Sequence, residues 1–249
     1  MSIQCRLRRC LEDCVMTVLS LRGLELLRGT DDSIYRVSLP SLELQAGEVL
    51  AITGPSGCGK STLIEAIGLI LRPEALEKYA LLGEDVTTWV QARHRSDDAK
   101  LASLRSRYFG FVPQSGGLLP YLTVAQNIRL QAQILGKTPD ANWLDEMSAR
   151  LGLAGLAQRY PQALSMGQRQ RVSFLRAIAH RPAVLLADEP TAALDPEHAA
   201  HLFRLMLDVV RQAQVAAVVV THEWTLVREL ALRSVRAQAV KPGHMEFVS

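Results

Sequence analysis

A glycine-rich loop between two apolar segments limits the folds open to this chain more than any other feature. The loop reads GPSGCGKST and spans residues 54–62. It satisfies the pattern G-x-x-x-x-G-K-[ST], follows the short apolar run 48–54 and precedes the apolar-periodic run 63–71. This context predicts a strand, a phosphate-binding loop and a helix, in preference to a chance glycine-rich turn.

The residue types in the loop suit a polyphosphate ligand. Glycines let backbone N–H groups close around phosphate oxygens, and the N-terminus of the following helix adds positive potential. Lys60 is expected to reach the outer phosphates and Ser61 to ligate Mg²⁺. The residues expected to contact the ligand are Gly54, Pro55, Ser56, Gly57, Cys58, Gly59, Lys60, Ser61 and Thr62.

Polar side chains end two other apolar runs. Asp188 and Glu189 end the run 183–190, and His222 lies near the end of the run 215–223. Asp188 is suited to hold Mg²⁺ through water, and Glu189 to polarise an attacking water. Such carboxylates can be mere solubilising charges, and a lone histidine is more often structural. The phosphate loop in the same chain favours the interpretation as a site.

Continuous apolar runs that alternate with helical patterns are typical of a parallel sheet covered on both faces. The runs 183–190 and 215–223 flank such a helical pattern at 196–213. A further strand is expected at 108–114, and helices at 122–135 and 143–153.

The N-terminal part has a different pattern. Residues 15–27 and 33–44 carry β-branched and alternating apolar residues and predict an antiparallel pair joined by a turn at 29–32. Residues 72–107 are expected to form variable surface structure, with the charged stretch 92–100 as a solvated face.

The stretch LSMGQ at 164–168 predicts a helix start. Ser165 precedes the helically spaced apolar residues Val172, Leu175 and Ile178, which makes it a plausible N-cap. The first turn of that helix is therefore a potential anion site.

The order of these motifs resembles the nucleotide-binding domain of ABC transporters, over about residues 15 to 240. The motifs are the phosphate loop, Gln114, LSMGQ, Asp188–Glu189, ALD at 193–195 and His222. The resemblance implies an α/β fold, a P-loop NTPase of ABC type, with a mostly parallel sheet core, an antiparallel β subdomain and a helical insertion. It implies one ABC ATPase domain over 1–249, with the core and β subdomain at 15–112 and 172–249 and the helical subdomain, which carries the signature motif, at 113–171.

The resemblance also implies roles for single residues. Gln114 matches the glutamine that contacts Mg²⁺ and the transmembrane partner, so that Ser61, Gln114 and Asp188 form the metal set. Glu189 matches the catalytic glutamate and His222 the histidine at the γ-phosphate, and they join Lys60 as catalytic residues. Asp195 matches the D-loop aspartate. The signature motif is represented by Ser165, Gly167 and Gln168.

In this family the signature helix points at the γ-phosphate of ATP held by the opposing subunit. The resemblance therefore implies ATP and Mg²⁺ as cofactors, a homodimer or pseudo-dimer in the ATP-bound state, and a separate transmembrane permease. Hydrolysis removes the γ-phosphate contacts, so that the dimer can open.

The chain departs from the family pattern at two positions. Met166 stands where the family usually has glycine, and its side chain either crowds the approaching phosphate or points into the helical insertion, which we favour because Ser165 and Gly167 remain. Tyr35 is the nearest candidate for the aromatic residue that stacks on adenine, but its strand-like surroundings favour a packed-core role.

Charge and composition disfavour several classes of protein. A net charge of +3 is too small to indicate a nucleic-acid partner, and no apolar run reaches the 18 or so residues of a membrane helix. The N-terminus lacks a signal-peptide pattern, so we expect a cytoplasmic protein, peripheral on the cytoplasmic face of the inner membrane. Cys5, Cys10 and Cys14 form no C-x-x-C pair and are expected to be reduced thiols.

Several functions remain open. Residues 109–128 are similar to the matching segment in ATPases of lipoprotein-release and macrolide-efflux systems, which favours that type over an importer ATPase. The alternatives outside transport are a P-loop kinase acting on a small molecule, and a nucleotide-dependent scaffold or switch with negligible hydrolysis.

Overall fold

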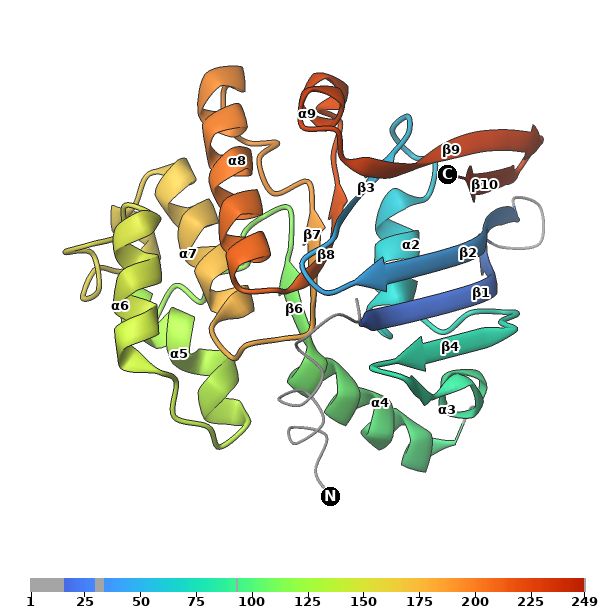
Figure 1. Ribbon diagram of the computed structural model, residues 1–249, viewed down its shortest axis with the longest axis horizontal. Coiled ribbons are helices and arrows are strands. Elements are labelled where there is room, and N and C mark those ends of the chain that lie inside the picture. Colours follow the sequence, from blue (N-terminus) through green and yellow to red (C-terminus); the bar gives the residue numbers. More distant parts are fainter. Residues whose placement is uncertain (1–15, 30–33, 93, 249) are drawn as a thin grey trace.

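The computed structural model describes residues 16–29, 34–92 and 94–248, which form a ten-stranded mixed sheet with helices packed against it (Figure 1). The predicted turn at 29–32 and the three N-terminal cysteines lie wholly or largely outside these ranges. From one edge to the other the strands are β5 (Glu84–Asp85), β4 (Lys78–Leu81), β1 (Thr17–Arg28), β2 (Tyr35–Gln45), β10 (His244–Val248), β9 (Arg233–Lys241), β3 (Val49–Thr53), β8 (Ala216–Val220), β7 (Val184–Asp188) and β6 (Phe109–Val112).

The part of the sheet that carries the predicted site is parallel. Strands β3, β8, β7 and β6 pair in parallel, and β9 pairs in parallel with β3. Every residue of β3 and β8 is buried, as their continuous apolar sequences predict. Helices α2 (Lys60–Ile67), α7 (Met166–Ile178) and α8 (Pro196–Gln212) pack against this part. Because parallel strands point the same way, the segments that follow β3, β7 and β8 meet at one edge of the sheet.

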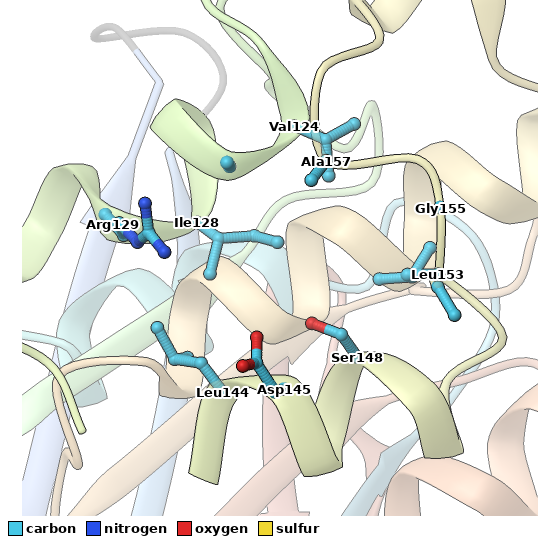
Figure 2. A pocket seen from close by; sticks show the side chains of 11 residues that line it. Val124, Ile128, Arg129, Leu144, Asp145, Ser148, Leu153, Gly155 and Ala157 are labelled. Atoms are coloured by element: carbon cyan, nitrogen blue, oxygen red, sulfur yellow. The ribbon is translucent and has the colours of Figure 1, made fainter. Parts of the chain in front are cut away.

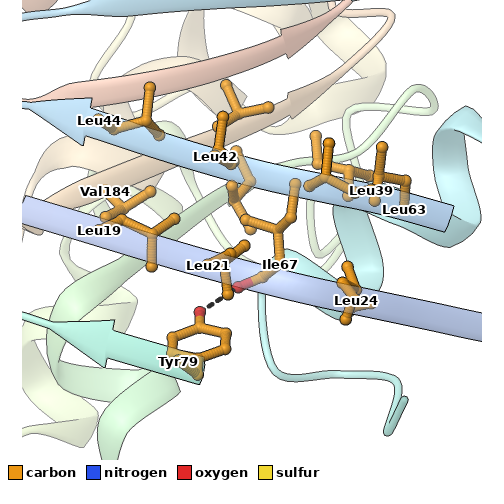
Figure 3. Close-up of a cluster of buried hydrophobic side chains, with 14 of the residues drawn as sticks. Leu19, Leu21, Leu24, Leu39, Leu42, Leu44, Leu63, Ile67, Tyr79 and Val184 are labelled. Carbon is orange, nitrogen blue, oxygen red and sulfur yellow. Dashed lines mark hydrogen bonds between the residues drawn. The ribbon is translucent and has the colours of Figure 1, made fainter. Parts of the chain in front are cut away.

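The N-terminal strands form the predicted antiparallel pair. Strands β1 and β2 pair in antiparallel register, with Leu19 opposite Leu44 and Leu21 opposite Leu42. Figure 3 shows leucines of both strands gathered around Leu63 and Ile67 of α2. One hydrophobic core therefore joins the antiparallel strands to the helix that follows the phosphate loop.

The segment 72–107 is only partly the surface structure expected from sequence. It forms β4, β5, α3 (Thr87–Gln91) and α4 (Arg95–Tyr108), and it buries Tyr79, Val86, Val90 and Leu101 in the main core. The prediction of variable surface structure is therefore wrong for these positions. The charged stretch 92–100 is mostly exposed where described, except Asp97, which is buried and pairs with Lys100 at 3.1 Å.

The helices α5 (Val124–Ile134), α6 (Ala141–Arg150) and α7 gather at one end of the molecule, away from β1, β2 and β4 (Figure 1). Thr123 caps α5 in a capping box with Gln126. The short helices η1 (Pro161–Ala163) and α9 (Trp224–Glu229) complete the helical elements of the described residues. Both long helices predicted between β6 and LSMGQ are present, with ends that differ by up to three residues.

Strands β9 and β10 were not predicted. The burial pattern of β9 explains this, because only Val235 among its nine residues is buried. The strand therefore lacks the apolar run that identifies β3, β7 and β8 in the sequence. In the sheet, β9 and β10 lie between β2 and β3, and so join the antiparallel strands to the parallel ones.

Candidate functional site

The loop 54–62 lies between β3 and α2, as predicted. Gly59 is the N-cap of α2 and has φ +96°, and a Cβ atom placed on it would lie 2.5 Å from Cγ2 of Val37. Only glycine fits this position without strain. Gly57 has φ +75° and would have no neighbour within 4 Å of a Cβ atom, so one face of the loop is open.

Lys60 is buried at the start of α2, and its side chain bends back over the loop. Its Nζ atom donates to the carbonyl oxygens of Pro55 at 2.8 Å and Gly54 at 3.1 Å. Cys58 is a buried free thiol in the same loop, and burial raises its pKa. The loop amides and this ammonium group give the loop a positive polarity that suits phosphate oxygens.

Asp188 ends β7 beside the loop. Burial raises the pKa of Asp188, while a hydrogen bond from the Ser61 side chain opposes that shift. The Oδ1 atom of Asp188 is buried and has no hydrogen-bond partner. A buried carboxylate oxygen with no partner, next to a serine hydroxyl, is a donor set that fits a hard divalent cation such as Mg²⁺.

Glu189 is the meeting point of three segments. Its Oε1 atom lies 2.6 Å from Nε2 of His222, and its Oε2 atom accepts a hydrogen bond of 3.1 Å from Nε2 of Gln114. Its backbone has φ +47°, a region that non-glycine residues rarely adopt, and its N–H donates to the carbonyl of Val220. The structure thus brings together Gln114, the adjacent Asp188 and Glu189, and His222, which the sequence placed at the ends of three different strands.

Ser165 is the N-cap of α7, as predicted. Its hydroxyl accepts from the N–H of Gln168 at 3.2 Å, and the Gln168 side chain accepts from the N–H of Ser165 at 3.0 Å, which completes a capping box. A Cβ atom on Gly167 would lie 3.6 Å from Leu194. Within the part of the chain that the structure describes, no hydrogen bond joins these three residues to the loop 54–62.

Asp195 is the N-cap of α8 and is exposed. Its carboxylate accepts from the N–H of His198 at 3.2 Å and pairs with Nδ1 of the same residue at 2.9 Å. These contacts with His198 lower the pKa of Asp195. The position gives Asp195 a local capping role, whatever it contacts in an assembly.

The two departures from the family pattern have clear positions. Met166 is 41% exposed, and its Sδ atom lies 3.7 Å from Nη2 of Arg169, so the side chain runs along its own helix and is not buried in the helical insertion. Tyr35 packs against the main core, as favoured from sequence, and a Cβ atom on Gly59 would lie 3.6 Å from its Cε1 atom. Burial raises the pKa of Tyr35.

A pocket of about 290 Å³ lies elsewhere, between α5, α6 and the loop 153–157 (Figure 2). Val124, Ile128, Leu144 and Leu153 give it an apolar lining, and none of the predicted site residues lines it. The predicted site is therefore an open edge of the sheet and does not coincide with this cavity.

Comparison with known families now places the chain. The sequence model described as ABC transporter matches residues 38–192, which is more than half of the protein. The chain belongs to the ABC transporter family. The predicted family and the predicted fold class, an ABC-type P-loop NTPase, are both confirmed, and as a member of this family the chain is an ATP-binding ATPase.

Relatives and solved structures agree with this assignment. The lipoprotein-releasing system ATP-binding protein LolD of Maricaulis maris (strain MCS10) is 40% identical over 208 residues, which cover 82% of this chain and 85% of that protein. The L-cystine transport system ATP-binding protein TcyN of Escherichia coli (strain K12) is 39% identical over 197 residues, which cover 78% of this chain and 77% of that protein. The dimeric post-hydrolysis structure of the ATP-binding cassette MJ0796, bound to ADP and Pi, matches with a TM-score of 0.73 at 27% identity, covering 91% of this chain and 96% of that one. No helix among the residues described here is long and apolar enough to cross a membrane.

Proposed function

We propose that this chain is the ATP-hydrolysing subunit of a transporter, and that it dimerises around two ATP molecules to drive a separate membrane-spanning permease. The observation that carries the proposal is the convergence of Gln114 and His222 on the carboxylate of Glu189, at the sheet edge that also holds the phosphate loop. An ion pair with a purely structural role would need only His222 beside Glu189, and would not need Gln114 as well.

Each residue at this edge has a part in hydrolysis. The loop amides and Lys60 bind the phosphates of ATP. To do so, the ammonium group of Lys60 gives up its hydrogen bonds to the loop carbonyls and donates to phosphate oxygens instead. Glu189 accepts a proton from the attacking water, and His222 orients the glutamate and the γ-phosphate. Ser61, Gln114 and Asp188 would hold Mg²⁺, which neutralises charge on the phosphates.

Dimerisation explains the position of the signature helix. Ser165, Gly167 and Gln168 lie at the N-terminus of α7, where free N–H groups attract an anion. They make no hydrogen bond to the phosphate loop of their own chain, so we assign them to the γ-phosphate of the opposing subunit. The similar cassette MJ0796 has been solved as a dimer, which supports this arrangement.

The transport system is proposed from the relatives. Several similar proteins are named as ATP-binding proteins of lipoprotein-releasing systems, which supports a lipoprotein-release type subunit on the cytoplasmic face of the inner membrane. The similarity to an L-cystine transport ATPase keeps an importer as the alternative. Co-purification of the chain from detergent-solubilised membranes, followed by identification of the bound permease, distinguishes the two.

Glu189→Gln tests the proposal as a whole. The amide cannot accept the proton, so we expect ATP hydrolysis by the full chain to fall by at least about 100-fold while ATP still binds. The variant is expected to elute as an ATP-bound dimer in gel filtration with Mg²⁺. A pure nucleotide switch would show no change from wild type, and a small-molecule kinase would not depend on the signature helix. The proposal fails if both chains stay monomeric at saturating ATP and Mg²⁺ in the presence of their permease.

A further inference from the structure

One side of α7 is polar although it faces the interior. Gln170, Ser173 and Arg176 recur at intervals of three residues, which places them along one side of the helix. Gln170 is 2% exposed and Ser173 is 0% exposed. Polar groups buried in this way destabilise a protein unless they form hydrogen bonds. The Ser173 hydroxyl and Oε1 of Gln170 have no hydrogen-bond partner, so the amide group of Gln170 and the Arg176 guanidinium are the donors on this side of α7 that need a polar surface to pack on.

That surface is the backbone of residues 114–117. Nε2 of Gln170 donates to the carbonyl oxygen of Gln114 at 3.1 Å. The Arg176 guanidinium donates to two further carbonyls of the same loop, Gly117 at 2.7 Å and Gly116 at 3.0 Å. The fork of an arginine suits two neighbouring acceptors. Three hydrogen bonds thus tie three residues of this loop, Gln114, Gly116 and Gly117, to one helix.

The loop has little else to hold it in place. Gln114, Ser115 and Gly117 are exposed, and both glycines have positive φ, +74° and +56°. Within the described residues, the loop's own backbone contributes one turn hydrogen bond, from the N–H of Gly116 to the carbonyl of Pro113 at 2.9 Å. Since the Gln114 side chain ends on Oε2 of Glu189, any shift of this backbone moves that contact.

We propose that Gln170 and Arg176 are positioning residues for Gln114: by binding the backbone carbonyls of 114, 116 and 117 they fix the glutamine side chain on the catalytic carboxylate. The inference rests on the proposed function of Gln114 and Glu189 and deepens it. The helix that holds the loop also has Ser165 as its N-cap, so one helix presents the signature motif and sets the position of Gln114. Neither residue needs to touch ATP for this role.

A double-mutant cycle on the full chain tests the proposal. ATPase activity at saturating ATP and Mg²⁺ is measured for wild type, Gln114→Ala, Arg176→Met and the double variant. We expect each single change to lower kcat by about tenfold, the factor that corresponds to 1.4 kcal/mol, with little change in KM. Because Arg176 acts through Gln114, the double variant should be no slower than the slower single variant. Arg176→Lys keeps one donor group and should recover part of the loss.

Arg105 offers a matched control on α4. It is also a partly buried arginine whose guanidinium donates to a backbone carbonyl, that of Leu69 at 2.7 Å. Arg105→Met should lower the melting temperature as Arg176→Met does, yet leave kcat near the wild-type value. If Arg176→Met does not fold, Gln170→Met removes one donor at nearly constant volume and enters the same cycle.

The outcomes separate the two proposals. If the losses of Arg176→Met and Gln114→Ala multiply to about 100-fold in the double variant, or if Gln114→Ala leaves kcat unchanged, the positioning role is overturned while the ATPase proposal stands. If Glu189→Gln hydrolyses ATP like wild type, the proposed function itself fails.

Discussion

Nε2 of His222 lies 2.6 Å from Oε1 of Glu189, and the two residues follow adjacent parallel strands, β8 and β7. The backbone of Glu189 leaves the extended conformation at this point, with φ +47°. The carboxylate is therefore oriented by side chains from other segments and not by its own strand. This arrangement lets a change in either neighbour alter the geometry of the proposed base directly.

Removing the imidazole of His222 should abolish most ATP hydrolysis while ATP binding is retained. For His222→Ala we expect kcat to fall by roughly 100-fold or more, the range for losing a group that assists proton transfer, while ATP binding is retained. Steady-state hydrolysis and binding of a fluorescent ATP analogue measure the two effects. His201→Ala, on the exposed side of α8, is the matched control and should keep wild-type turnover. Equal activity of both variants would contradict the role of His222.

A long side chain at the N-terminus of α7 should block dimerisation around ATP without preventing a single chain from binding ATP. Ser165→Arg removes the N-cap, which costs about 1 kcal/mol of stability, and places a bulky group where the opposing nucleotide is proposed to lie. We expect turnover to be abolished while a single chain still binds ATP. Ser103→Arg, an exposed position on α4, should be active. Normal turnover of Ser165→Arg would refute contact across the dimer.

Gly59 should be essential for binding ATP because a side chain there would clash with Val37. This effect can be separated from the strain of a positive φ by comparison with Gly83. Both Gly59 and Gly83 have positive φ, but a Cβ atom would clash with Val37 only at Gly59 and would meet nothing within 4 Å at Gly83. Gly83→Ala should cost on the order of 1 kcal/mol in stability and bind ATP normally. Gly59→Ala should lose ATP binding, as measured by titration calorimetry. Comparable affinities in the two variants would show that the loop tolerates a side chain.

His180 should make the protein less stable in mild acid. Its ring is buried at the end of α7, Nε2 donates to the carbonyl of Phe109 at 3.0 Å, and Nδ1 has no partner. Burial lowers the pKa of His180 to about 4, from about 6.5 in the unfolded chain. Between these values the unfolded chain binds more protons, so stability is present in full above pH 6.5 and falls as the pH drops toward 4, by up to about 3 kcal/mol.

Urea unfolding of wild type and His180→Gln measures this dependence. The glutamine amide can still donate to Phe109 but does not titrate, so the variant should show a flatter profile between pH 6.5 and 4. Its stability at pH 7.5, where the imidazole is neutral, gives the cost of repacking alone. Parallel profiles for the two proteins would rule out His180 as the group responsible.

The phosphate loop and the N-terminal ends of α2 and α7 were predictable from sequence because the residues that determine each of them are close together in the chain. The turn at Gly59, the ammonium of Lys60 and the start of α2 lie within a few residues of one another, and the cap of α7 needs only Ser165 and Gln168. The strands β3, β7 and β8 were predictable because they are buried on both faces, and so have continuous apolar sequences.

The tertiary structure decided what lies between those motifs. Gln114 and Glu189 are 75 residues apart, and they meet because β6 pairs with β7 in parallel and places both strand ends at one edge. The hydrogen bonds from Gln170 and Arg176 to the 114–117 loop follow from the packing of α7 on that edge. Strand β9 has one buried residue and no recognisable pattern, yet it joins both parts of the sheet. The loop and the helix caps are determined by neighbouring residues. The contacts of Gln114 with Glu189 and with α7 depend on the strand order, which no local sequence pattern encodes.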